Sequence, residues 1–252
     1  MEKHNAPVIS MTFVNRAPGA DIEVFERYRK WVNEVYLPLQ MNIPGLRGID
    51  SYQAARESLE YPVTGVVYHW ENLQAYGTPN TPERTAIQQE AAAWVKRGVR
   101  DPIWSVVYEL IKSYRNVSPS SGRPDTRIEG APVMSLEAFR LSAEDEEKYV
   151  SWFTDYGCSS FIPLFLRLPG FKGYDWYKYM GLGRGPDMRE HEYPGYISMI
   201  YFENTSAFDN FVKSPELASF LKVMRSVFPR ALKYEWYVQY QLVKSVRNNN
   251  LP

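Results

Sequence analysis

The sequence has a single cysteine, three histidines, no excess of charge of either sign and no long apolar run. One cysteine excludes an intrachain disulfide. The 29 basic and 29 acidic residues argue against a nucleic-acid or anionic-membrane surface, because such partners select a basic excess. No stretch approaches the roughly 18 apolar residues of a membrane-spanning helix, and the first residues, MEKHNAPV, lack the apolar centre of a signal peptide. We therefore expect a cytoplasmic globular protein with no nucleic-acid or membrane partner.

Aromatic residues are abundant, at 15% of the chain, with 19 Tyr and 7 Trp. Rings bury large areas, and Tyr and Trp also carry a polar atom that needs a partner. The composition is compatible with a well-filled core. It is equally compatible with a cavity walled by rings that binds an apolar or aromatic molecule.

Two halves of the chain repeat each other. APVISM at 6–11 is echoed by APVMSL at 131–136, an offset of 125 residues, and PGLRG at 44–48 is echoed by PGFKG at the same offset. YPVTGVVYHWEN at 61–72 and WSVVYELIKS at 104–113 have counterparts at an offset of 132. Similar blocks in the same order at near-constant offsets indicate a tandem duplication. The sequence predicts a first repeat over 1–116, a Ser- and Pro-rich linker over 117–130, a second repeat over 131–246 and a tail over 247–252.

Each repeat has the pattern strand, helix, strand, strand, helix, strand. In the first repeat the expected strands are Val8–Val14, Leu46–Gln53, Gly65–Glu71 and Trp104–Lys112, with helices starting near Asp21 and Thr81. This βαββαβ order is that of the ferredoxin-like fold. A ferredoxin-like sheet has helices on one face only, so a second copy can cover the other face. We therefore expect an α+β protein in which two ferredoxin-like repeats form an intramolecular dimeric α+β barrel. The wholly apolar face of the last strand, which includes Val106 and Tyr108, is expected under the helices.

These residues resemble a known superfamily. YLPL followed by IPGLRGIDSYQ in the first repeat, and YFENTSAFDNFVKSPEL in the second, are similar to segments of the dimeric α+β barrel proteins, and most of all to the EthD-like family. The resemblance covers nearly the whole chain. It implies a pocket between the sheet and the helices of each repeat. It also implies a range of activities: cofactor-independent oxygenases, cyclases, isomerases, dehydratases and, in fused forms, heme proteins. The EthD-like pattern places a histidine just before the xPL segment, where this chain has Tyr36 and Phe161, so the resemblance implies the fold and not one reaction.

His69 and Asp50 are the candidate catalytic residues. His69 lies mid-strand, with Tyr201 at the duplicate position, and an imidazole can transfer protons near neutral pH. The alternative is a half-buried structural histidine. Asp50 and its duplicate Asp175 lie mid-strand, where Asp is disfavoured. They either form ion pairs, with Arg47 or Lys172 as candidate partners, or orient a histidine and a ligand.

Aromatic residues near these positions are the candidate substrate-binding groups. The full set, with the second carboxylate, is Tyr36, Tyr52, Tyr68, Trp70, Asp175, Tyr177 and Tyr201. Glu137 is a weaker candidate. His191 lies in a Gly-containing insertion of the second repeat, which is either a surface loop or a lid. Cys158 is expected to be an inert thiol.

No metal site and no cofactor are expected, because no His, Cys and Asp cluster has metal-ligand spacing; heme binding would need His69 or His191. We expect a cofactor-independent enzyme that transfers a proton, in a dehydration, isomerisation or cyclisation, on a small hydrophobic or aromatic oxygenated molecule. His69 would move the proton. The alternative is a non-catalytic small-ligand-binding or scaffolding barrel, with a heme-binding or oxygenase member of the superfamily as a further option. A homo-oligomer is compatible with the sequence, which does not decide the oligomeric state.

Overall fold

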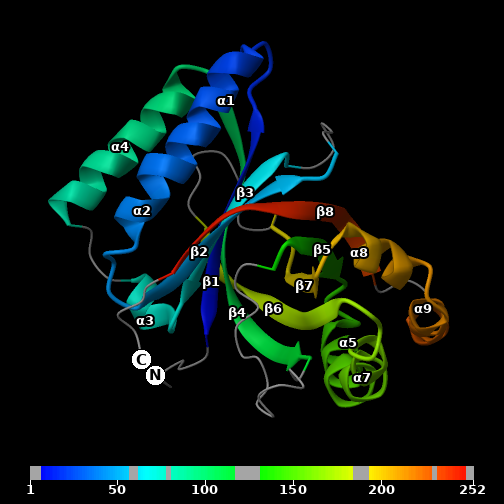
Figure 1. Ribbon diagram of the computed structural model, residues 1–252. Helices are drawn as coiled ribbons and strands as arrows, with labels where there is room; N and C mark the ends of the chain where they lie inside the picture. Colours follow the sequence, from blue (N-terminus) through cyan, green and yellow to red (C-terminus); the bar gives the residue numbers. More distant parts are fainter. Residues whose placement is uncertain are drawn as a thin grey trace. The chain divides into compact units, whose positions relative to one another are not determined.

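The computed structural model describes residues 7–56, 62–77, 81–116, 131–183, 193–228 and 232–247. The first repeat contains strands β1 (Val8–Arg16), β2 (Leu46–Ala54), β3 (Thr64–Trp70) and β4 (Arg100–Arg115), and helices α1 (Ile22–Trp31), α2 (Leu37–Gln40), α3 (Leu73–Tyr76) and α4 (Pro82–Lys96). The second contains β5 (Val133–Leu141), β6 (Phe171–Gly183), β7 (Tyr196–Phe202) and β8 (Leu232–Arg247), with α5 (Glu146–Trp152), α6 (Cys158–Ser160), α7 (Ile162–Phe165), α8 (Thr205–Val212) and α9 (Pro215–Val227). The predicted βαββαβ order is confirmed twice (Figure 1).

The strands form one closed barrel in the order β1-β3-β2-β8-β5-β7-β6-β4. The register is the same in both repeats: Val8 pairs with Trp70 as Val133 pairs with Phe202, and each β2 or β6 strand has its irregularity two residues after its start. The expected α+β barrel is therefore confirmed, and matched registers identify equivalent residues in the two repeats.

The chain divides into two compact units that do not coincide with the two sequence repeats. Unit 1 comprises Met1–Glu109, Met180–Tyr193 and Leu242–Pro252, and unit 2 comprises Leu110–Tyr179 and Pro194–Gln241. The last residues of β4 thus belong to unit 2, and those of β8 belong to unit 1. Both strands are longer than the sequence predicts, because their ends extend to Arg115 and Arg247.

The glycine of the Pro-Gly dipeptide before β2, and of the one before β6, is required for steric reasons. Gly45 has φ of 74° and Gly170 has φ of 76°, in the left-handed region that favours glycine. A Cβ atom on either residue would also lie 2.4 or 2.5 Å from the Cβ of a helical alanine, Ala75 or Ala207. The repeated PG signal therefore marks a turn that packs tightly against the helix after the next strand.

The helix after the first strand contains a π-helical turn in both repeats. Asp21 caps α1 by accepting hydrogen bonds from the backbone N–H groups of Glu23, at 2.7 Å, and Val24. The helix widens at Val32–Tyr36 before α2, and its counterpart widens at Phe153–Gly157. A π-helical turn inserts one extra residue and re-aims the side chains around it, and such turns are frequent at functional sites.

The helices cover one face of the sheet in each unit. In unit 1, α1 and α4 lie side by side, with the rings of Tyr28 and Trp94 5.6 Å apart (Figure 1). Val107 packs in the cluster beneath these helices, whereas Val106 and Tyr108 lie on the other sheet face. The expectation that the wholly apolar face of the last strand meets the helices is therefore wrong. Both faces of this strand are enclosed, so apolarity alone did not distinguish them.

Candidate functional site

Unit 1 contains a cavity of about 490 Å³ between its sheet and the helices α1 and α4. Strand residues with every second side chain on this face form its floor: Thr12, Val14, Ser51, Thr64, Val66 and Tyr68. The roof comes from α1, the π-helical turn and α4, which contribute Tyr28, Trp31, Asn33, Tyr36, Ala91 and Val95. A cavity of this size is typical of small-molecule sites.

Four polar groups in the cavity are already paired. Arg100 donates a hydrogen bond to the Tyr28 phenol, and its guanidinium lies 5.5 Å from the centre of that ring. Tyr36 and Tyr68 are hydrogen-bonded to each other. Burial is the main reason why the pKa of Tyr68 is raised well above its usual value, with the neighbouring Tyr36 adding to it. The Tyr68 phenol is therefore protonated at neutral pH.

Two buried polar atoms of the lining have no hydrogen-bond partner among the described residues. They are Oδ1 of Asn33 and Nε of Arg100. The first is an acceptor and the second a donor. Buried polar atoms are seldom left unpaired, because each costs about 1–3 kcal/mol of desolvation. A ligand that brings one donor and one acceptor would remove both penalties.

Of the predicted site residues, the structure places Tyr36 and Tyr68 in the cavity wall. Trp70 follows Tyr68 by two residues on the same face of β3 and is buried under α3. Its ring stacks on that of Tyr68, with the ring centres 6.4 Å apart, and its indole N–H donates a hydrogen bond to Ser10. His69 and Asp50 do not line the cavity, because they alternate with Tyr68 and Ser51 along their strands and lie on the opposite sheet face. Tyr52 follows Asp50 by two residues and is buried on that same face.

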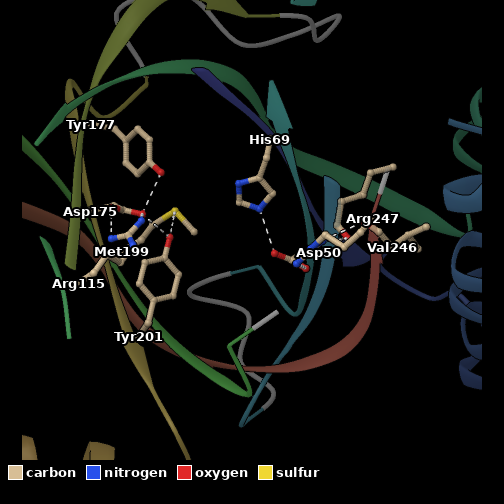
Figure 2. Close-up of polar contacts among 10 residues, drawn as sticks. Asp50, His69, Arg115, Asp175, Tyr177, Met199, Tyr201, Val246 and Arg247 are labelled. Carbon is tan, nitrogen blue, oxygen red and sulfur yellow. Dashed lines mark hydrogen bonds and ion pairs between the residues drawn. The ribbon is translucent and has the colours of Figure 1, made fainter. Parts of the chain in front are cut away.

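His69, Asp50 and Arg247 form a buried polar cluster on the face away from the helices (Figure 2). Asp50 is 1% exposed, with Oδ2 3.0 Å from Nε2 of His69 and Oδ1 2.5 Å from Nη2 of Arg247. Burial alone would raise the pKa of Asp50, but the hydrogen bond and charge of His69, together with the Arg247 guanidinium, lower it to about 2. Asp50 thus orients a histidine and forms an ion pair, the two alternatives that the sequence left open. Its cationic partner is Arg247, not Arg47.

Asp175 occupies the equivalent position in unit 2 with a richer set of partners (Figure 2). Arg115 binds both carboxylate oxygens, at 2.5 and 2.8 Å. The Ser113, Tyr177 and Tyr201 hydroxyls donate at 2.7, 3.2 and 3.0 Å. Tyr177 and Tyr201 are thus held by Asp175 and do not line the cavity. Arg115 and Arg247 are duplicates, each at the end of the last strand of its repeat, so this ion pair occurs twice.

The region of unit 2 that corresponds to the cavity is filled. Only about 30 Å³ remains, lined by Glu137 and by rings such as Phe153 and Phe220. Burial raises the pKa of Glu137 to about 7, and burial likewise raises the pKa of the Cys158 thiol to about 11, in keeping with an unreactive cysteine. His191 lies outside the described residues. Among those described, no group of three or more His, Cys, Asp or Glu side chains is placed to hold a metal ion.

The sequence analysis missed Tyr28, Asn33 and Arg100. A signal for them existed in the comparison of the two repeats. Ser51, Thr64 and Val14 stand where the second repeat has Trp176, Tyr196 and Phe139. Three large-for-small differences at strand positions on the helix side indicate that space is left open in the first repeat.

Comparison with known proteins supports the fold and leaves the reaction undetermined. No protein-family model matches this chain, and no curated protein matches it in sequence. Among solved structures, an anthrone oxidase-like protein is 10% identical with a TM-score of 0.64, covering 98% of this chain and 94% of its own. A candidate monooxygenase from Fusobacterium nucleatum subsp. nucleatum is 8% identical with a TM-score of 0.63, covering 100% and 98%. A candidate chlorite dismutase is 12% identical with a TM-score of 0.52, covering 95% and 96%. The chain thus has the dimeric α+β barrel fold.

None of the helices described is both long and apolar enough to cross a membrane.

Proposed function

We propose that the cavity of unit 1 binds a small hydrophobic or aromatic molecule that carries oxygen. The observation that carries this proposal is a space of about 490 Å³ walled by rings and aliphatic side chains, in which Asn33 and Arg100 each have a polar atom with no partner in the described part of the chain. Apolar walls favour the body of such a ligand through burial of its surface. The few polar groups fix its orientation.

As an enzyme, the protein would transfer a proton on this ligand without a cofactor, in a dehydration, isomerisation or cyclisation. The ionisable groups that line the cavity include the hydrogen-bonded phenols of Tyr36 and Tyr68, together with Arg100. A phenol of this pair would donate a proton to an oxygen of the ligand, and a water molecule in the cavity would accept the proton that leaves a carbon of the ligand. Arg100 would stabilise the negative charge that develops on the ligand during this exchange. A catalytic role for His69 and Asp50 requires access to the opposite sheet face, so it stays a separate prediction.

Oxygenation is the second candidate reaction, since two of the similar structures are named for an oxidase and a monooxygenase. Oxygen uptake measured beside product formation separates it from proton transfer. A heme held by histidine does not fit the described cavity: no His, Cys or Met is among its lining residues, and His69 is bonded to Asp50 on the other face. An EthD-like activity stays a prediction.

Filling the cavity tests the proposal. We expect Ser51→Trp, which introduces the residue found at the equivalent position of unit 2, to weaken binding of the neutral probe anthracene-2-carboxamide at least tenfold. Isothermal titration calorimetry measures the affinity, and Ser51→Ala is the matched control that removes the hydroxyl without filling space. Equal affinity of the Trp and Ala variants, or no binding by the wild-type protein, contradicts a ligand site in this cavity.

A further inference from the structure

The charged side chains that line the cavity of unit 1 are all basic. Its lining includes Arg29, Lys96 and Arg100 and no acidic residue among those described. Glu26, on the exposed side of α1, compensates Arg29 with an ion pair at 2.8 Å. Lys96 lies at the exposed end of α4. Arg100 lies against the buried Tyr28 ring, 5.5 Å from its centre, and has no carboxylate partner among the described residues.

The fixed position of Arg100 leaves its buried Nε–H group available to a ligand. One terminal nitrogen donates to the carbonyl oxygen of Ala91 at 3.2 Å, and the side chain also donates to the Tyr28 phenol. Its Nε is buried and has no hydrogen-bond partner within the described residues. A guanidinium that is anchored in this way is preorganised, so little side-chain entropy is lost when an oxyanion binds to it.

Unit 2 provides an internal comparison. The position equivalent to Thr12 on the cavity floor is Glu137 there, and the position equivalent to Arg100 is Leu232. The filled unit has therefore lost the cation and gained an acid, whereas the open unit keeps a cation with no acidic neighbour in the lining. Arg100 is half-buried, and a cation in such surroundings without a counter-charge carries a desolvation cost. Such a cation persists where a bound anion supplies the missing charge.

We infer that the ligand of unit 1 is an organic anion, with an apolar or aromatic body and a carboxylate or another acidic oxygen bound at Arg100. Asn33 Oδ1 accepts a hydrogen bond from a hydroxyl or amide of the same ligand. This inference rests on the proposed ligand site and adds the charge of the ligand and the residue that recognises it.

Two probes that differ only in charge test the inference. We expect anthracene-2-carboxylate to bind the wild-type protein at least tenfold more tightly than anthracene-2-carboxamide, since a hydrogen bond between a guanidinium and a carboxylate is stronger than one to a neutral amide. Arg100→Leu, the residue of unit 2, should abolish this preference, so that the carboxylate and the amide bind this variant with equal affinity. Arg100→Lys should keep part of the preference, and increasing salt should weaken only the carboxylate.

The outcomes separate the two proposals. Binding of both probes with equal affinity overturns the anion inference and leaves the cavity as a ligand site. Binding of neither probe overturns both. Should Arg100→Leu fail to fold, as judged by circular dichroism, the salt dependence in the wild-type protein and the Arg100→Lys variant decide the matter. A carboxylate preference that survives unchanged in a folded Arg100→Leu protein also overturns the inference.

Discussion

The two units have the same order of strands and helices, but one contains a cavity and the other is filled. In unit 1 the space between sheet and helices is open and lined by small side chains, among them Ser51 and Thr64. In unit 2 the equivalent positions carry Trp176 and Tyr196, whose rings stack 5.6 Å apart, and the ring of Phe153 lies 4.7 Å from Trp176. One repeat therefore has a cavity and the other has a packed aromatic core. The difference teaches that the open space in unit 1 is a feature of its side chains and not of the fold.

Substitutions at the equivalent positions Ser51 and Trp176 should show the largest difference in the free energy of unfolding. Trp176→Ser removes a fully buried indole from unit 2, and we expect a loss of about 3–5 kcal/mol in the free energy of unfolding. Ser51→Trp in unit 1 should cost at most about 1 kcal/mol, because the ring enters existing space. Urea denaturation measures both values, with Trp176→Phe as an intermediate control. Equal costs for the two substitutions would contradict the contrast between an open and a filled unit.

The next largest difference in stability is expected between the ion pairs Arg115–Asp175 and Arg247–Asp50. Arg115→Met leaves Asp175 buried without its cation, and we expect a loss of roughly 3 kcal/mol in the free energy of unfolding. Arg247→Met should cost less, about 1–2 kcal/mol, because Arg247 is 26% exposed and His69 remains beside Asp50. Thermal and urea unfolding report the difference. Lys172→Met, which removes an exposed 3.9 Å pair with Glu203, is the control and should change stability little. A larger cost for Arg247 than for Arg115 would reverse the ranking.

Two carboxyl groups, one in each unit, should give opposite pH dependences. The pKa of Asp50 is lowered from 3.8 to about 2, so its contribution to stability is present above pH 4 and is lost as the pH falls towards 2. The pKa of Glu137 is raised from 4.5 to about 7, so its contribution is full below pH 4.5 and is lost as the pH rises to 7. The free energy of unfolding against pH should lose the acid slope in Asp50→Asn and the slope between pH 4.5 and 7 in Glu137→Gln. Unchanged slopes in these variants would refute the assigned environments.

His69 should matter least for ligand binding. His69→Gln changes a side chain on the sheet face away from the cavity, so probe affinity should stay within about twofold, while the lost hydrogen bond to Asp50 costs roughly 1–2 kcal/mol of stability. If a substrate is found, a pH–rate profile that is identical in this variant excludes His69 as the proton carrier. A large loss of probe binding would show instead that the two faces are coupled. His69→Tyr, which copies Tyr201, is the matched second variant.

Much of the fold followed from the repetition of the sequence. Matches such as PGLRG and PGFKG mark turns that need glycine for steric reasons, and such local requirements are readable from sequence. The face of each strand was harder to assign. Val106 and Val107 are both buried, so the alternation of apolar and polar residues carries no information there. The sequence predicts both His69 and Tyr68 as site residues, and of these two Tyr68 lines the cavity. The site also depends on a π-helical turn that contains Asn33 and Tyr36, and no pattern of residues in the sequence predicts this turn.

The partners of the buried carboxylates could not be predicted from spacing. Arg247 lies 197 residues from Asp50 and was assigned to a tail, whereas it ends β8 and binds that carboxylate. Long-range pairs of this kind depend on which strands become neighbours in the closed sheet. The duplication itself held the hint, because Arg115 and Arg247 recur at the same offset as the strands that carry them.

The shared strand β8 also has a consequence for synthesis in the cell. The edge of β2 finds its hydrogen-bonding neighbour only in β8, whose last residue is Arg247. While the ribosome is still translating the second half, the nascent first half therefore presents an unsatisfied strand edge, a known route to aggregation. The first repeat can complete its sheet only after β8, the last strand, has been synthesised. Chaperone protection during translation should therefore benefit this protein more than a protein whose strands pair only with their neighbours in sequence.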